Sequence, residues 1–254
     1  MMKNTVMLTT LVVAILVLLA WEFLPPAFGV PRYIIPTPSQ CLDELIRNIR
    51  LDNLVGHTLS TFAMTVVGFA IGSFLGAFIG YMLGMSTFWE KVLSPYILAL
   101  QIAPKVAFAP LFIMWFGFTA WPKLLVTVLI VFFPILVNVL QAMKTVDRDI
   151  INLARAYNLT RWQIFRKIEF PSTLPSLLAG LRIGSTLAVI GVTVGELVGG
   201  NTGLGFLISY GEGQANAAMV FNAILLLTLI GIILYTIITW AEARLLHYIP
   251  KAEY

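Results

Sequence analysis

The feature that most limits the fold of this chain is a long stretch without Asp, Glu, Lys or Arg, which runs from Asn53 to Trp89. A transmembrane helix needs about 20 consecutive, mostly apolar residues, so this stretch is long enough to cross a bilayer. In soluble domains about a quarter of the residues are charged, whereas in this chain 11% are charged and 59% are hydrophobic. These observations predict a membrane protein and exclude a soluble domain of ordinary composition.

Further apolar segments predict one all-α, polytopic domain over residues 1–254, with about six transmembrane helices. The expected crossings are residues 4–21, 53–89, 92–116, 123–143, 174–198 and 217–246. The third should break at Ala103-Pro104-Lys105, and the fourth should kink at Pro134, because proline removes a helical hydrogen bond. Residues 25–52 predict a proline-rich loop followed by a short amphipathic helix at the membrane surface.

Glycine recurs at every fourth position in the second of these segments. The residues are Gly68, Gly72, Gly76, Gly80 and Gly84. Residues four apart share one face of a helix, and small residues allow another helix to approach closely. The pattern therefore predicts a packing face and carries no information about a substrate.

The basic residues are distributed unevenly between the two sides of this topology. One side holds Lys3, Lys91, Lys144, Arg148, Arg155, Arg161, Arg166, Lys167, Arg244 and Lys251, and the other holds Arg32, Arg47, Arg50 and Lys123. Cytoplasmic loops carry the excess of Lys and Arg, so both termini are predicted to be cytoplasmic. The net charge of +4 is too small to indicate nucleic-acid binding.

The only long polar interval, residues 147–171, predicts two short helices joined by a tight turn. Asp149 is expected to be the N-cap of the first helix. Asn158 is expected to end it, because Asn tolerates the left-handed conformation. Thr160 and Gln163 have the spacing of a capping box for the second helix.

The same interval contains apolar residues that should make it rigid. Leu159 and Ile164 are spaced to form a hydrophobic staple, and Pro171 is expected to end the second helix because it forces Phe170 out of helical geometry. A basic loop that only sets membrane topology is the simpler interpretation. A DNA-binding helix-turn-helix fits poorly, since the second helix carries Trp162 and not a row of base-reading polar residues.

Polar residues at membrane depth are the candidates for a transport path. Gln101, Pro104, Lys105 and Glu196 are predicted to lie near such a path, because a broken helix is tolerated where it lines water or packs in protein. The alternative is that Lys105 extends to an interface or forms a structural pair with Glu196. Arg182 is interpreted as an interfacial anchor.

No pattern of catalytic or metal-binding residues is present in the sequence. The glycine-rich run 199–205 follows an apolar helix and lacks the Lys that follows a phosphate-binding loop, so we expect an outer loop or a short re-entrant piece. His57 and His247 are far apart in sequence, and Cys41 is the only cysteine. We therefore expect no metal site and no disulfide within the chain.

Residues 152–171 resemble the EAA loop of the membrane subunits of bacterial ABC importers, the binding-protein-dependent transport inner-membrane component family. That pattern is Glu-Ala-Ala, three residues, Gly, nine residues, Ile, two residues, Pro. The matching positions are Asn152, Leu153, Ala154, Asn158, Ile168 and Pro171, with Asn, Leu and Asn in place of Glu, Ala and Gly. Four other blocks, residues 104–117, 132–138, 174–184 and 195–205, resemble the branch that imports nitrate, taurine, sulfonates and thiamine precursors.

The resemblance implies a type I importer permease in the bacterial inner membrane. In that family the EAA loop is a coupling helix that contacts a separate ATPase. The residues expected to make this contact are Ala154, Arg155, Ala156, Tyr157, Asn158, Leu159, Arg161 and Trp162. ATP and Mg²⁺ would bind to the ATPase and no cofactor to this chain. The implied partners are an ATPase dimer, a second permease copy, an extracytoplasmic solute-binding protein and membrane lipid.

Two other functions compete with this interpretation. An ion-driven secondary transporter also has broken helices and buried charges, but such proteins are usually built from two related halves, and this sequence shows no internal repeat. A structural membrane protein would have no need for a rigid basic element at this spacing.

Overall fold

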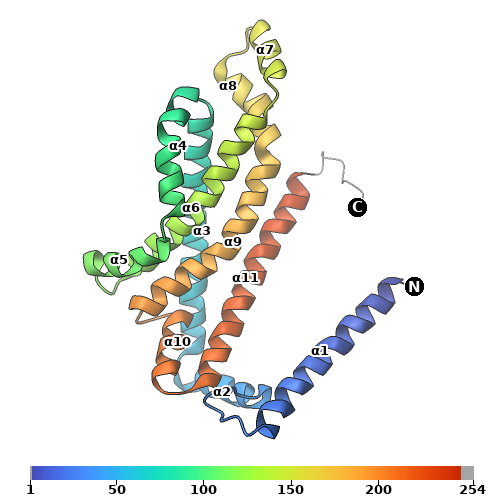
Figure 1. Cartoon of the computed structure of the whole chain (residues 1–254), viewed down its shortest axis with the longest axis vertical. Coiled ribbons are helices and arrows are strands. Elements are labelled where there is room, and N and C mark those ends of the chain that lie inside the picture. Colours follow the sequence, from blue (N-terminus) through green and yellow to red (C-terminus); the bar gives the residue numbers. More distant parts are fainter. Residues whose placement is uncertain (1, 247–254) are drawn as a thin grey trace.

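The computed structural model describes residues 2–246, with side chains from Thr5 onward. Within this range the regular elements are all helical. Four long helices form a bundle: α3 (Leu54–Gly84), α6 (Ala120–Thr145), α9 (Phe170–Gly199) and α11 (Ala217–Leu245). Figure 1 shows α3 close to the long axis of the molecule, with α6 and α9 inclined to it. With α1 (Met2–Ala27), the described residues contain five helices long and apolar enough to cross a membrane.

The third predicted crossing is broken, as its prolines indicated. Helix α4 (Thr87–Ile102) is followed by a short 3₁₀ helix, η1 (Lys105–Phe108), and by α5 (Ala109–Phe116). The two halves are bent by 81°, and together they are long and apolar enough for one broken span or a re-entrant loop. Pro104 lies at the break with an extended backbone (ψ 94°). The described residues thus contain five spans, or six if the bent pair is one span, in agreement with the prediction of about six.

The core of the bundle surrounds α6, which lies between two glycine faces. A Cβ atom added to Gly76 of α3 would come within 2.6 Å of the Phe132 carbonyl oxygen, and one added to Gly80 within 3.0 Å of the Leu136 carbonyl oxygen. The whole series at every fourth position meets α6 in this way. Because glycine has no side chain, the backbones of α3 and α6 can approach closely.

Helix α6 also meets a second glycine face, which was not predicted from the sequence. Its residues belong to α9 and are Gly180, Gly184, Gly191 and Gly195. The spacing from Gly184 to Gly191 is seven residues, and buried Ala188 lies between them, so small residues still recur on one face. Reading Ala as equivalent to Gly reveals this pattern.

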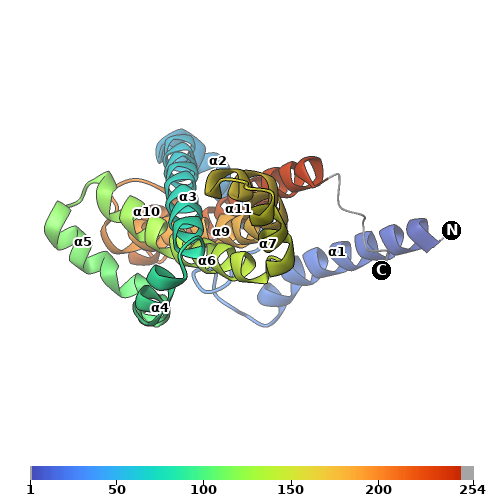
Figure 2. The same ribbon diagram turned by 90° about the horizontal axis from the view of Figure 1, so that it is seen from above.

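The N-terminal part lies outside the bundle. Figure 2 shows α1 leaving the molecule on the side opposite to α5, and its most apolar window has no buried residue. Helix α2 (Pro38–Leu51) lies across one end of the bundle (Figure 1). Four large apolar residues of α2 are exposed: Leu42, Ile46, Ile49 and Leu51. This exposure agrees with the amphipathic surface helix predicted for the segment.

The ends of the molecule differ in composition. Helix α2 and α10 (Leu204–Gly213) lie at one end of the bundle, and α7 (Arg148–Ala156) and α8 (Arg161–Ile164) lie at the other (Figure 1). The first residues of α1 and the last residues of α11 both point toward the α7–α8 end.

Candidate functional site

Residues 147–171, here called the projecting element, extend beyond the bundle at one end (Figure 1). Asp147 is the N-cap of α7, and its Oδ1 accepts a hydrogen bond from the Asp149 amide at 2.8 Å. The prediction of Asp149 as N-cap was therefore wrong by two residues. Asp149 lies instead in the first turn of α7, where a negative charge favours the positive end of the helix dipole.

The turn between α7 and α8 has the predicted geometry. Asn158 has a left-handed backbone with φ 57°. The Leu159 amide donates to the Ala154 carbonyl at 3.1 Å, and the Asn158 amide donates to the Arg155 carbonyl at 2.9 Å, which is the Schellman pattern. Thr160 then caps α8, and the reciprocal bond to Gln163 completes the predicted capping box. The turn is thus held by hydrogen bonds from both helices.

Pro171 does not end the second helix, contrary to the prediction. Phe170 is helical (φ −62°, ψ −48°), and α8 continues into α9 through a π-helical turn, Phe165–Glu169. In this turn the Phe170 amide donates to the Phe165 carbonyl, five residues earlier. A wider turn relieves the clash between a proline ring and the preceding turn. The projecting element is therefore continuous with a membrane-spanning helix.

Several apolar side chains of the projecting element are exposed. Tyr157 is 74% exposed and Trp162 is 64% exposed, with Leu153 and Ile150 nearby in α7. Ala154 is buried, Leu159 is half-buried, and Arg155, Ala156, Asn158 and Arg161 are exposed. Exposed apolar residues grouped on a polar element indicate a surface that binds a partner.

The base of the projecting element is joined to α3. Phe165 packs edge to face on Tyr81, with ring centroids 5.3 Å apart, and Phe170 lies 5.7 Å from the same ring. The Tyr81 hydroxyl lies 3.1 Å from Thr173 Oγ1. Movement of the projecting element would therefore displace both α3 and α9.

Three of the four residues predicted for a transport path, Gln101, Pro104 and Lys105, lie together at the break after α4, whereas Glu196 lies in a separate buried cluster. Lys105 Nζ donates to the Gln101 carbonyl and lies 5.1 Å from the ring centroid of Phe133. Pro104 is exposed at the break after α4. Glu196 is 1% exposed and pairs with Lys123, at 3.9 Å from Nζ to Oε1. The suggested structural pair between Lys105 and Glu196 is not formed.

The carboxylate of Glu196 helps to hold the start of α10. It accepts hydrogen bonds from Thr61 Oγ1 at 2.9 Å and from the Gly205 amide at 3.0 Å. The Leu204 amide donates to Thr61 Oγ1, and the Gly203 amide donates to His57 Nδ1. Free amides at a helix start need acceptors, and here α3 and α9 supply them.

This buried cluster explains the glycine-rich run 199–205, which forms a tight connection into a short helix. The sequence analysis identified Glu196 but missed its partners Lys123, Thr61 and His57. Lys123 stands alone at the start of an apolar helix, and that position was the available signal for a buried partner. Arg182 likewise has a partner, Glu242 of α11 at 3.6 Å, so it is more than an interfacial anchor.

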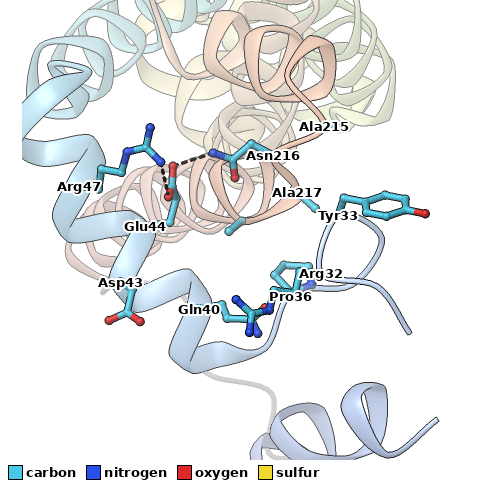
Figure 3. Close-up of a pocket in the computed structure, with 11 residues that line it drawn as sticks. Arg32, Tyr33, Pro36, Gln40, Asp43, Glu44, Arg47, Ala215, Asn216 and Ala217 are labelled. Carbon is cyan, nitrogen blue, oxygen red and sulfur yellow. Dashed lines mark hydrogen bonds and ion pairs between the residues drawn. The ribbon is translucent and has the colours of Figure 1, made fainter. Parts of the chain in front are cut away.

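A pocket of about 520 Å³ lies at the end opposite to the projecting element. Figure 3 shows it between α2 and the turn that joins α10 to α11. Glu44 is already engaged, with Asn216 Nδ2 at 2.7 Å and Arg47 at 3.6 Å (Figure 3). Arg32 and Asp43 are exposed charged groups at its edge.

Comparisons with known proteins agree with this architecture. The sequence profile of the family described as binding-protein-dependent transport system inner membrane component matches residues 72–247. The formylaminopyrimidine transport permease protein ThiX of Halalkalibacterium halodurans is 35% identical over 243 residues, covering 93% of this chain and 94% of that protein. The riboflavin transport system permease protein RibX of Chloroflexus aurantiacus is 36% identical over 237 residues, covering 93% and 88%.

Two more distant proteins are also similar to this chain. The putative aliphatic sulfonates transport permease protein SsuC of Bacillus subtilis is 29% identical over 228 residues, covering 90% of this chain and 83% of that protein. Among solved structures, an inward-facing conformation of the MetNI methionine ABC transporter has a chain with a TM-score of 0.63 and 24% identity. The match covers 77% of this chain and 95% of the transporter chain. At this level of identity the similarity shows only that the fold is shared.

Proposed function

Because this chain belongs to the family of binding-protein-dependent transport system inner membrane components, it is a membrane-spanning permease subunit of an ABC importer, and we propose that its projecting element docks on a separate ATPase. The observation that carries the proposal is the exposed pair Tyr157 and Trp162, at 74% and 64%, on an element continuous with α9. Large exposed aromatic residues are typical anchors of protein interfaces.

The construction of the projecting element suits a part that transmits force. Its turn is held by the Schellman pattern and by the capping box, and its second helix continues into a membrane-spanning helix without a loop. An ATPase that closes on ATP would therefore push directly on α9. Because ATP and Mg²⁺ would bind to that partner, this chain is proposed to bind no cofactor itself.

The complete importer is proposed to contain two copies of this chain, an ATPase dimer and an extracytoplasmic solute-binding protein. The α7–α8 end would face the cytoplasm, since it carries the larger share of Lys and Arg. The end with α2 and the pocket of Figure 3 would then face the binding protein. Gln101, Pro104, Lys105 and Glu196 remain the candidates for residues near the transport path.

We propose a small polar organic solute as the cargo, with nitrogen heterocycles as the first class to examine. Two relatives of at least 35% identity are named for transport of a formylaminopyrimidine and of riboflavin. A relative of 29% identity is named for sulfonates. The test is to purify the complex with its binding protein and to titrate riboflavin, a formylaminopyrimidine and taurine, with thermal shift as the readout.

The docking proposal is tested with Tyr157→Asp. A carboxylate placed in an apolar contact is costly to bury unpaired, so we expect the ATPase to be lost during affinity purification of the permease. Leu159→Asp and Trp162→Asp should act in the same way. The measurement is the amount of ATPase recovered per permease.

The matched control is Tyr33→Asp, which makes the same change at a 62% exposed tyrosine of the opposite end. It should leave ATPase recovery unchanged. Membrane insertion, measured as permease in the membrane fraction, should be equal for all variants. Full ATPase recovery with the Tyr157, Leu159 and Trp162 variants would contradict the docking assignment.

A further inference from the structure

Arg161 lies on the projecting element, but its charged group turns toward the membrane helices. Its Nη1 lies 2.6 Å from Glu169 Oε1, and its Nη2 donates to the Met85 carbonyl at 3.3 Å. The arginine side chain is 41% exposed, whereas that of Glu169 is 4% exposed. Both terminal nitrogens of this guanidinium are therefore engaged by partners within the chain.

Glu169 depends on this contact. Its Oε2 is buried and has no hydrogen-bond partner among the described residues. Within the same residues, the one cation within ion-pair distance of its carboxylate is Arg161. A buried carboxylate without a compensating charge costs several kcal/mol, so the position of Arg161 relative to Glu169 is strongly constrained.

The three residues belong to two separate helical stretches, the continuous helix that runs from α8 through the π-helical turn into α9, and the end of α3. Arg161 is the first residue of α8, Glu169 is the last residue of the π-helical turn before α9, and Met85 is the C-cap of α3. The apolar contacts at this base, such as Phe165 on Tyr81, are non-directional and tolerate sliding. A charge-assisted hydrogen bond from a planar guanidinium has a defined direction and length.

We propose that Arg161, Glu169 and the Met85 carbonyl form a clamp that makes α8, α3 and α9 move together. Arg161 is then a positioning residue of the transport cycle and not a contact to the ATPase. The inference rests on the proposed function of the projecting element, because it needs a partner that moves this element. Lys144 and Glu90, 2.7 Å apart, form a separate ion pair between α6 and α4.

The test uses the full complex of permease and ATPase in lipid nanodiscs, with the purified binding protein as the probe. Three quantities are measured: ATPase recovered per permease, basal ATP hydrolysis, and the stimulation of hydrolysis by the binding protein. Stimulation requires a signal to pass through the membrane helices, whereas the first two quantities do not. For Arg161→Ala we expect normal recovery and basal hydrolysis, and stimulation lowered roughly two- to thirtyfold.

A second variant guards against misfolding, since Arg161→Ala leaves Glu169 buried and unpaired. The double substitution Arg161→Ala with Glu169→Gln removes both charges, and we expect it to assemble and still lack most of the stimulation. Arg161→Lys keeps a charge near Glu169 but not the planar fork to Met85. It should restore only part of the stimulation, whereas a loss caused only by the unpaired charge of Glu169 would be restored in full.

The matched control is Arg166→Ala, an exposed arginine of the same element, which should keep the stimulation of the unmodified complex. The clamp is wrong if the Arg161 variants lose ATPase recovery while the complexes that do assemble are stimulated normally. It is also wrong if Arg166→Ala lowers the stimulation as much as Arg161→Ala. If no ATPase is recovered with the unmodified permease, or if the binding protein does not stimulate ATP hydrolysis by the unmodified complex, the proposed function is wrong, and so is the clamp.

Discussion

Gly203 is constrained both by its backbone conformation and by the packing around it. Its φ of +112° lies in a region that residues with side chains rarely adopt, and a Cβ atom there would collide with the carboxyl group of Glu196. The amide of Gly203 also donates to His57 Nδ1. A glycine at this position is thus required by the backbone and by the buried carboxylate together.

Gly203→Ala is expected to destabilise the permease by about 1–3 kcal/mol, the usual cost of a strained backbone. The measurement is the fraction of monodisperse protein that remains after heating in detergent. The control is Gly213→Ala in the same short helix α10, where an added Cβ meets no atom within 4 Å. Equal heat sensitivity of the two variants would contradict the packing argument.

Cys41 is buried at 4% exposure, and burial, together with the nearby charge of Glu22, raises the pKa of its thiol above the ordinary value. A raised pKa lowers the thiolate fraction at pH 7.5, and the thiolate is the reactive form. We expect alkylation by N-ethylmaleimide to be slow in the folded protein, to increase as the pH rises, and to be fast in denaturant. Since this is the only cysteine, mass spectrometry of the whole chain measures its alkylation directly. Equal alkylation rates in the folded and the denatured protein would show that Cys41 is accessible.

At the scale of the elements, short-range signals predicted local structure well. The capping box at Thr160, the left-handed Asn158 and the break near Pro104 each depend on residues within one or two turns. Asp147 and Pro171 were the exceptions. Two aspartates two residues apart are both acceptable caps, and a proline ends a helix only where the neighbouring turn cannot widen.

Glu196 and Lys123 join α9 to α6 across the bundle, and they provide a prediction at this scale. Glu196→Gln leaves Lys123 buried without a counter-charge, so we expect a loss of about 3–5 kcal/mol. Adding Lys123→Met should recover part of this loss, because no unpaired charge then remains. Thermal stability of the single and double variants forms a double-mutant cycle. Additive losses would show that the pair does not interact.

The whole molecule places the projecting element at one end and α2 and α10 at the other (Figure 1). The family assignment makes the protein an importer subunit of the membrane, and the absolute orientation is a prediction from the basic residues. In a Cys41→Ala background, Tyr33→Cys should react with a membrane-impermeant maleimide added to spheroplasts. Arg148→Cys should react only after the membrane is opened, and the reverse pattern would invert the topology.

The sequence by itself determined which segments are long and apolar enough to cross the membrane, where one of them breaks, and which polar interval stands apart. Those properties depend on the lengths of apolar runs and on neighbours three or four residues away, which the sequence places directly. The tertiary structure alone decided which polar groups meet. Lys123 became the partner of Glu196, Arg161 turned to Glu169 and Met85, and α6 came to lie between two glycine faces. Such pairings depend on how each helix is rotated and shifted against its neighbours, and that choice is made by the packing of the whole bundle.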